Sequence, residues 1–167
     1  MSGKMTEGRM VAFCCDGNTC RSKMAEAAFN DLAKKRGSPL RAESFGVGVK
    51  EGTETSPYAI AALQGVGIEA EKTPAVHAKR VDVSRFSCVV CLSGAAEAVL
   101  KIYFSGALSG QNPRLYTAEE LIGKSVSDPI GGGEGAYKKA LSSITLLCER
   151  LFSALAADGN KNDSAPV

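Results

Sequence analysis

Apolar residues along the chain fall into short runs separated by stretches of helical spacing. Residues 10–15, with the sequence MVAFCC, form an apolar run that stops at Asp16-Gly17-Asn18, as a buried strand does where it ends in a turn. Three further segments are predicted to be strands, the last of them followed by a turn: residues 40–49, 85–92 and 115–121. The pattern therefore predicts four short strands.

Helical spacing of apolar residues occurs in four stretches between or after these runs: residues 22–35, 56–66, 95–103 and 136–157. Gly37 follows the first stretch as a stop signal, and Pro57 stands in the first turn of the second. Leu147 and Leu151 belong to an apolar stripe along the last and longest stretch. Residues 125–135, SVSDPIGGGEG, carry the turn residues of a loop.

The alternation of strands with helices is typical of an α/β fold with a mostly parallel sheet. We expect a single domain over residues 9–157, built on a four-stranded parallel sheet flanked by helices and joined by right-handed crossovers. The polar ends, residues 1–8 and 158–167, lack apolar periodicity and are predicted to be flexible. Ligands of such sheets bind beyond the carboxyl ends of the strands, which is where the loop beginning at Cys15 falls.

Composition and charge argue against several classes of partner. The 167 residues are 44% hydrophobic and 23% charged, with a net charge of +2 and no long basic block, so nothing favours a nucleic-acid partner. No apolar run approaches the roughly 20 residues of a membrane helix, and the first residues, MSGKMTEGR, lack the apolar stretch of a secretory signal. We therefore expect a cytoplasmic protein with neither a membrane nor a nucleic-acid partner.

Six cysteines stand at positions 14, 15, 20, 88, 91 and 148. Without a secretory signal, reduced thiols are expected in preference to three disulfides. Cys88-Val-Val-Cys91 has the spacing of half a zinc site, but no second such pair follows, and His77 is the only histidine. We expect these two cysteines inside a buried strand, with no metal or other cofactor.

The segment from Cys15 to Arg21 places a cysteine and an arginine, separated by five residues, between a strand and a helix. A loop that wraps a helix N-terminus points several backbone N–H groups inward, and together with the helix dipole these groups bind an anion. Gly17 and Asn18 are residue types that tolerate the left-handed backbone such wrapping needs. The spacing therefore predicts a loop that holds phosphate or another oxyanion.

The reactive side chains of this loop suit phosphoryl transfer. Arg21 carries a planar fork of donors that can hold two phosphate oxygens. Cys15 lies in the same positive field, which favours the thiolate nucleophile, and Ser22 can donate a hydrogen bond to the sulfur. A cysteine after an apolar strand is otherwise commonly a buried core residue. The position after a strand, the Gly-Asn pair and the helix start are what favour a functional loop.

The stretch from Val11 to Glu26, VAFCCDGNTCRSKMAE, resembles the low-molecular-weight protein tyrosine phosphatases, whose usual pattern is C-x-G-N-x-C-R-S-P-M-A-E after an apolar strand. The resemblance covers about residues 10–152, because Ser44-Phe-Gly46, the Pro57 helix and Ser127-Asp128-Pro129 follow in the family's order. It implies Cys15 as the nucleophile, through a phosphocysteine intermediate, and Arg21 as the phosphate clamp. The residues assigned to phosphate binding and loop support are Asp16, Gly17, Asn18, Thr19, Cys20 and Ser22.

Two positions depart from the family's pattern. Lys23 replaces a proline that is optional in a first helical turn, and Asp16, where an apolar or small residue is usual, is expected to alter the mouth of the pocket. The resemblance also implies Asp128 as the general acid, although Asp-Pro alone is an ordinary turn. Cys20 matches a family cysteine that can form a reversible disulfide with the nucleophile; the alternative is a small residue that points into the core.

Two other functions compete with a phosphatase. Certain arsenate reductases share this loop and fold but need two further cysteines after the third strand, where this chain has Ser93 and Leu100, so arsenate reduction is disfavoured. The second is an anion-binding module that has lost its chemistry. Against it, the nucleophile, the arginine and the acid are all present.

The substrate is expected to be a phosphorylated protein side chain, either phosphotyrosine or phosphoarginine. Tyrosine-directed members usually carry a large apolar residue before the second cysteine and aromatic residues after Asp-Pro; Thr19 and Ile130-Gly131 stand there instead. The Asp-Pro-x-Gly-Gly pattern and the nine-residue step from Asp128 to Tyr137 resemble the bacterial protein-arginine phosphatase branch. Asp128 and Asp16 can accept hydrogen bonds from a phosphoguanidinium, and Ile130 and Tyr137 are expected to line its pocket. Phosphoarginine is slightly favoured.

Overall fold

The structure, a computed structural model, describes residues 9–105 and 113–163. Its helices and strands are β1 (Met10–Cys15), α2 (Arg21–Lys35), β2 (Arg41–Gly46), α3 (Pro57–Gly65), the 3-10 turns η1 (Ala78–Arg80) and η2 (Val83–Arg85), β3 (Cys88–Cys91), α4 (Gly94–Ser105), β4 (Arg114–Thr117), α5 (Ala118–Ile122) and α6 (Gly133–Asp163). The predicted flexible segment 1–8, and residues 164–167 of the predicted C-terminal tail, lie outside the described residues.

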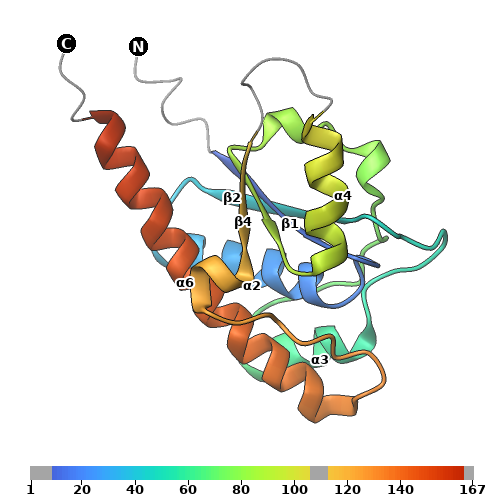
Figure 1. The fold of residues 1–167 in the computed structure, drawn as a ribbon. Helices are drawn as coiled ribbons and strands as arrows, with labels where there is room; N and C mark the ends of the chain where they lie inside the picture. The colour runs from blue at the N-terminus through green and yellow to red at the C-terminus, as the bar shows by residue number, and fades with distance from the viewer. Residues whose placement is uncertain (1–8, 106–112, 164–167) are drawn as a thin grey trace.

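The four strands form one parallel sheet in the order β2-β1-β3-β4, which confirms the predicted α/β fold (Figure 1). Cys15 pairs with Gly46 at the end of β1, and Phe13 pairs with Val90 of β3. The chain leaves β1 toward β2 on one side and returns to β3 on the other. The carboxyl ends of β1 and β3 therefore flank a topological switch point, where open α/β sheets bind ligands.

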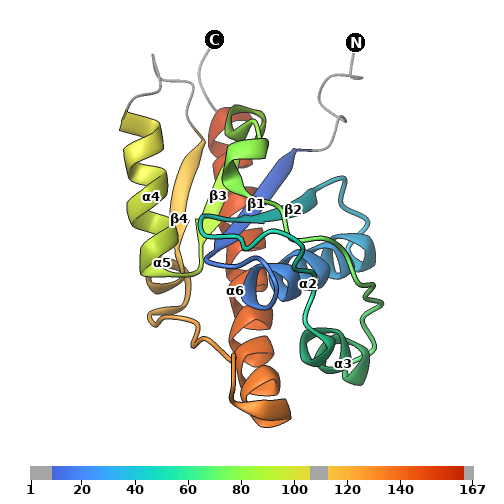
Figure 2. The ribbon, with the colours of Figure 1, turned by 90° about the vertical axis from the view of Figure 1, so that its right-hand side faces the viewer.

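Helices cover both faces of the sheet. Helices α2, α3 and α6 lie on one side and α4 on the other (Figures 1 and 2). Because successive side chains of a strand point to opposite faces, Phe13 and Cys15 belong to the core under α2 and α6, whereas Cys14 belongs to the core under α4. The two neighbouring cysteines at the end of β1 thus face different environments.

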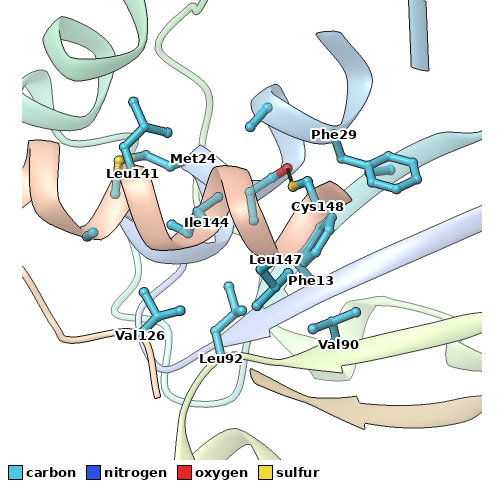
Figure 3. Close-up of a cluster of buried hydrophobic side chains, with 14 of the residues drawn as sticks. Phe13, Met24, Phe29, Val90, Leu92, Val126, Leu141, Ile144, Leu147 and Cys148 are labelled. Atoms are coloured by element: carbon cyan, nitrogen blue, oxygen red, sulfur yellow. Dashed lines mark hydrogen bonds between the residues drawn. The ribbon is translucent and has the colours of Figure 1, made fainter. Parts of the chain in front are cut away.

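The larger core forms where α2 and α6 cross the central strands (Figure 3). Phe13 of β1 packs edge-on against Phe29 of α2, with ring centroids 5.9 Å apart. The Cys148 thiol of α6 donates to the carbonyl of Ala25 at 3.7 Å, and Leu147 of the same helix is fully buried. These contacts fix the position of α2, whose first turn carries Arg21.

Helix α6 is long and apolar enough to cross a membrane by length and composition alone, over Gly133–Asp158, but the core helix of a soluble protein passes the same test. Here Ile144, Leu147 and Leu151 are buried in the core beneath the sheet. We therefore assign the apolar stripe of α6 to core packing.

Several predicted boundaries were wrong. Strand β2 ends at Gly46 instead of residue 49, and helix α6 begins at Gly133 instead of residue 136. Helix α6 continues to Asp163 instead of ending at residue 157, because Asp158 accepts hydrogen bonds from Arg114 and from the hydroxyl of Tyr116 on β4. The predicted turn after β4 is the short helix α5, whose first turn is capped by the Thr117 hydroxyl. Strand β3 begins at Cys88 and not at residue 85, because the Asp82 side chain accepts the Ser84 N–H and starts the turn η2.

The Cys88-Val-Val-Cys91 segment lies within β3, as predicted. Cys88 faces the core under α6 and Cys91 the core under α4. Burial raises the pKa of each thiol to about 12. Two thiols on opposite faces of a sheet cannot bind one zinc ion, so the geometry disfavours the zinc site that the spacing suggested.

Candidate active site

The loop that connects β1 to α2 lies at the carboxyl edge of the sheet, beside the switch point. Cys15 is the last residue of β1 and Arg21 the first of α2, so the loop spans residues 16–20. Asn18 adopts the left-handed backbone, with φ 54°, as predicted. Gly17 does not, and a Cβ there would only meet the Thr19 hydroxyl at 3.9 Å, so the chain reverses at Asn18 alone.

The Cys15 thiol lies at the centre of this loop and has two polar partners. Its Sγ is 2.9 Å from the Ser22 hydroxyl and accepts the backbone N–H of Asn18 at 3.3 Å. Cys14, one residue earlier, is buried among apolar side chains, and this burial raises its pKa strongly. A negative charge on sulfur is therefore stabilised by donors at Cys15 and opposed at Cys14.

Asn18 joins the loop to three other segments. Its side-chain amide donates to the hydroxyls of Ser22, at 2.7 Å, and Ser44, at 3.0 Å, while its Oδ1 accepts the Val76 N–H at 2.8 Å. Because the Ser22 oxygen accepts from Asn18, its own proton is free to point toward Cys15. The network thus directs the Ser22 hydroxyl as a donor to the thiol.

The same network ends at a partly buried carboxyl group. Ser44 donates its proton to Oε2 of Glu26 at 3.0 Å. Burial raises the pKa of Glu26, and the Ser44 hydrogen bond and the nearby Lys23 charge only partly oppose this shift. Hydrogen bonds therefore run in two directions from the Asn18 amide, one through Ser44 to Glu26 and the other through Ser22 to Cys15.

Arg21 is held at the edge of the loop by backbone carbonyls. Only 9% of its side chain is exposed, and Nη1 donates to Leu92 O and Val126 O, both at 3.3 Å. A guanidinium has five N–H donors. The hydrogen bonds to these described residues use Nη1, so the edge formed by Nε–H and Nη2–H can receive two oxygens of a phosphate.

Asp128 approaches this guanidinium from the loop before α6. Its Oδ2 lies 3.7 Å from Arg21 Nη2, and its side chain is 48% exposed. Oδ1 accepts the Ile130 N–H at 3.1 Å, which restrains the carboxylate. The structure therefore brings Asp128, from a loop far along the sequence, next to Arg21, the residue that closes the loop beginning at Cys15.

A cavity of about 450 Å³ opens beside Arg21 and Asp128, between the phosphate loop and the ends of β3 and α4. Asp16 lies on its wall, exposed, and accepts a hydrogen bond from the Ser93 hydroxyl at 2.5 Å. Asp16 and Asp128 thus line one cavity from two separate loops. Ile130, 65% exposed, follows Asp128 by two residues.

On the other side of the loop, Cys20 contacts an aromatic pair. Its Sγ lies 3.2 Å from the Tyr137 hydroxyl, which also accepts a hydrogen bond from Ser56 at 3.2 Å. Tyr58 stacks on the ring of Tyr137 at 5.3 Å and is half exposed. Burial raises the pKa of Tyr137. Tyr137 therefore supports the loop through its hydroxyl while Tyr58 covers its ring.

Thr19 lies between these features and is half-buried. Its hydroxyl is 3.5 Å from Cys20 Sγ, and its carbonyl accepts the Ser56 N–H at 2.9 Å. The backbone of Thr19 is thus held by the segment before α3. Because the backbone is held in this way, we expect that a substitution of the Thr19 side chain leaves the loop in place.

Several residues around the site were missed by sequence reasoning. Ser44 was quoted only as part of a motif, and Glu26, Ser56 and Tyr58 were given no role. Ser44 contacts the loop at Asn18 and Ser56 contacts it at the Thr19 carbonyl. Glu26 and Tyr58 reach it only indirectly, through Ser44 and Tyr137. The Ser44-Phe-Gly46 match was the one signal that could have found the first of them.

Comparison with known proteins shows the family. Residues 10–161 match the family described as low molecular weight phosphotyrosine protein phosphatase. The chain belongs to this family. It is a protein phosphatase.

Relatives of this low molecular weight phosphatase include both substrate branches. A protein-arginine-phosphatase of Bacillus subtilis (strain 168) is 27% identical over 159 residues, which cover 89% of this chain and 97% of the relative. A crystal structure of a low molecular weight protein tyrosine phosphatase from T. tengcongensis is 29% identical, with a TM-score of 0.77 over 88% of this chain and 99% of that one.

A third similar structure bears on the chemistry. It is a mutant of the YwlE arginine phosphatase with a phosphorylated active-site serine, 25% identical to this phosphatase, with a TM-score of 0.75 over 89% of this chain and 97% of that one. The match thus spans nearly the whole of each of these relatives, and the α/β fold is shared.

Proposed function

We propose that this phosphatase removes the phosphoryl group from phosphorylated protein side chains through a phosphocysteine on Cys15, and that phosphoarginine is its preferred substrate. The observation that carries the proposal is the position of the Cys15 thiol, 2.9 Å from Ser22 and 3.3 Å from the Asn18 N–H, in a loop whose edge is Arg21 and whose neighbour is Asp128. The proposed nucleophile and anion clamp belong to one loop, and the proposed acid contacts the clamp.

In the first half of the reaction, the Cys15 thiolate attacks phosphorus and the bond from phosphorus to the leaving nitrogen or oxygen breaks. Arg21 and the inward N–H groups of the loop stabilise the charge on the phosphoryl oxygens. Asp128 donates a proton to the leaving atom. The products are a phosphocysteine and the dephosphorylated side chain of the substrate.

In the second half, a water molecule attacks the phosphocysteine. Asp128, now a carboxylate, accepts the proton of this water, and the sulfur–phosphorus bond breaks. Inorganic phosphate leaves, and the Cys15 thiolate is regenerated with Ser22 and Asn18 as its donors. The phosphorylated serine in the related YwlE mutant supports a phosphorylated residue at the nucleophile position.

Three features support phosphoarginine. Asp16 and Asp128 line the same cavity and can accept hydrogen bonds from guanidinium nitrogens. Thr19 leaves more room beside the loop than a large apolar residue does. Ile130 offers an exposed apolar surface for the aliphatic part of arginine. Tyr137, the other residue predicted to line the pocket, is buried on the Cys20 side of the loop and does not border this cavity.

One observation favours phosphotyrosine as the second candidate. The Tyr58 ring is half exposed and stacks on Tyr137, so it offers an aromatic face on the Thr19 side of the loop against which a phenol ring can pack. The two candidate substrates would therefore contact different walls of the site. The guanidinium of phosphoarginine would contact the carboxylates, and the phenol ring of phosphotyrosine would contact the aromatic rings.

The deciding experiment is the measurement of kcat/KM on a phosphoarginine and a phosphotyrosine peptide of otherwise equal sequence. Cys15→Ser should abolish both activities, and acid-quenched wild-type enzyme should carry one phosphate on the Cys15 peptide. A larger kcat/KM on phosphotyrosine would overturn the substrate assignment, and activity in Cys15→Ser would overturn the mechanism.

Six free cysteines also support a reducing, cytoplasmic location.

A further inference from the structure

Lys23 is a buried cation directly behind the phosphate loop. It stands in the first turn of α2, one residue after Ser22, and only 7% of it is exposed. Its Nζ donates to the Thr73 hydroxyl at 2.8 Å and to the Pro74 carbonyl at 3.0 Å. These are neutral acceptors, and both lie on a segment far from α2 in sequence.

This placement is costly for a lysine. A positive side chain near a helix N-terminus opposes the helix dipole, and the first turn of α2 contains no acidic residue to offset it. Burial lowers the pKa of Lys23, and the charges of Glu26 and Cys15 only partly oppose that shift. A residue kept at such a position needs a compensating contact, and the one the structure provides is with Thr73 and Pro74.

The segment that Lys23 contacts also holds the phosphate loop. Two residues after Pro74, the Val76 N–H donates to Asn18 Oδ1 at 2.8 Å. Asn18 in turn donates to Ser22 through its side chain and to Cys15 Sγ through its backbone. A closed circuit of hydrogen bonds and backbone therefore connects Lys23 to residues 73–76, these residues to Asn18, and Asn18 back to α2 at Ser22.

The other contacts of this segment join it to loops and to the end of β2. Thr55 N–H donates to Thr73 O, Ala75 N–H to Thr53 O, and Gly46 N–H to Val76 O. Helix α2, by contrast, is anchored in the core by Met24 and Phe29. Lys23 ties the segment directly to α2, which also carries Ser22 and Arg21.

We propose that Lys23 is a positioning residue for the proposed reaction: by fixing residues 73–76 to α2, it keeps Asn18 and Ser22 in the arrangement that presents the Cys15 thiolate to phosphorus. The inference rests on the proposed function for its catalytic readout. Arg21 and the acid Asp128 are not part of the circuit. Because Arg21 is held by Leu92 O and Val126 O, loss of Lys23 should act more strongly on the nucleophile than on phosphate binding.

The test uses two variants. Lys23→Met keeps the length of the side chain and removes the donors; Lys23→Pro introduces the residue of the family's usual pattern, which the fold accepts. Each should lower kcat by about tenfold, the order expected when a nucleophile is slightly misplaced, and should change KM and the inhibition constant of inorganic phosphate by less than about twofold. Lys34→Met, an exposed lysine of the same helix, is the matched control and should leave kcat unchanged.

A second readout does not depend on any substrate. Alkylation of Cys15 by iodoacetamide at a fixed, mildly acidic pH, followed by peptide mass spectrometry, should slow in parallel with kcat, because the thiolate loses the aligned donors Ser22 and Asn18. If wild type proves inactive on phosphoproteins, the proposed function fails while this measurement still tests Lys23.

Three results would overturn the role of Lys23. The first is a lower melting temperature with unchanged kcat and alkylation rate per folded molecule, which would mean a purely structural contact. The second is an equal loss in Lys34→Met, and the third is a loss confined to KM. Folded fractions measured by circular dichroism at the assay temperature make these outcomes distinguishable from simple unfolding.

Discussion

Asp128 lies 3.7 Å from Arg21 through one carboxylate oxygen and is tied to the Ile130 N–H through the other. The carboxyl group is thus oriented by its own loop and stands beside the residue that we propose clamps phosphate. An acid in this position can reach an atom leaving from phosphorus without a large rearrangement. The dependence of its effect on the leaving group provides a direct test.

Asp128→Asn should reduce kcat on phosphoarginine or phosphotyrosine peptides by about a hundredfold or more, the usual contribution of a general acid. On an activated aryl phosphate, whose leaving group needs no proton, the loss should be much smaller. Steady-state rates on a series of aryl phosphates of rising phenol pKa measure this. An equal loss on every member of the series would show that Asp128 is not the acid.

Arg21→Lys should lower kcat/KM by about a hundred- to a thousandfold, because lysine cannot provide two parallel donors to the phosphoryl oxygens in the transition state. It also cannot reproduce the contacts to Leu92 O and Val126 O. Arg41→Lys, at an exposed position on β2, is the control and should keep full activity. Near-normal turnover in Arg21→Lys would contradict the assignment of the clamp.

Gly46 is required by the close approach of β2 to the phosphate loop. A Cβ at this position would lie 2.5 Å from Asp16 O and 3.0 Å from Asn18 N. Gly46→Ala should therefore destabilise the fold by about 1–3 kcal/mol, as overpacking does, and lower activity by displacing Asn18. At Gly48 a Cβ would lie 3.8 Å from Asp16 O, so Gly48→Ala should be nearly neutral. Denaturant unfolding of the pair checks the contrast.

The buried Glu26 should make stability depend on pH. Its pKa is raised in the folded state, chiefly by burial, so the folded protein binds a proton more readily than the unfolded chain does. The contribution of Glu26 to the free energy of unfolding is fully present below the pKa that this group has in the unfolded chain. It is lost as the pH rises through the pKa that the group has in the folded protein. Glu26→Gln, which still accepts from Ser44, should therefore be more stable than wild type at neutral pH, with the difference vanishing in acid.

Urea unfolding of wild type and Glu26→Gln across this pH range gives the difference directly. Glu69→Gln, at an exposed position, corrects for the general effect of removing one negative charge. A wild type more stable than Glu26→Gln at neutral pH would mean that the attraction of Lys23 outweighs the burial of the carboxylate.

The features that the sequence predicts well are those specified by local signals. The apolar run that ends at Cys15, the turn at Asn18 and the helix that begins by Arg21 are adjacent in sequence, so propensity and periodicity determine them. The four-stranded parallel sheet follows from the alternation of elements. By contrast, the end of α6 depends on Asp158 meeting Arg114 and Tyr116 across the fold, and no local pattern shows this contact.

The same distinction applies to the candidate site. Cys15 and Arg21 share one loop, and their relation to Asp128 was predicted only through the family resemblance. The supporting contacts of Ser44, Lys23 and Tyr58 come from long-range pairings. Lys23 in particular looked harmless in sequence, because its neighbours on the helix give no hint that it reaches Thr73. Such residues become visible only when distant segments are brought together.

Thr19 is the position at which the substrate preference is most directly testable. Its backbone is fixed by the hydrogen bond from Ser56 N–H to its carbonyl, so a changed side chain should act on the pocket and leave the loop in place. A threonine there leaves space for a planar guanidinium and offers a hydroxyl beside Cys20 Sγ at 3.5 Å. A larger apolar side chain would crowd the guanidinium and pack better against a phenol ring.

Thr19→Ile should therefore lower activity on phosphoarginine and raise it on phosphotyrosine. Pocket changes of one or two methyl groups are worth about 1–3 kcal/mol, so the ratio of the two kcat/KM values should move by about tenfold or more. Thr19→Val removes the hydroxyl and keeps the branched shape, so it separates crowding of the pocket from loss of a hydroxyl contact. If crowding is the cause, the ratio of the two kcat/KM values in Thr19→Val should stay near that of wild type. If the hydroxyl contact is the cause, the ratio should shift as it does in Thr19→Ile. If both activities instead fell together in Thr19→Ile, the side chain would be a support of the loop, and the phosphoarginine assignment would lose its main specificity argument.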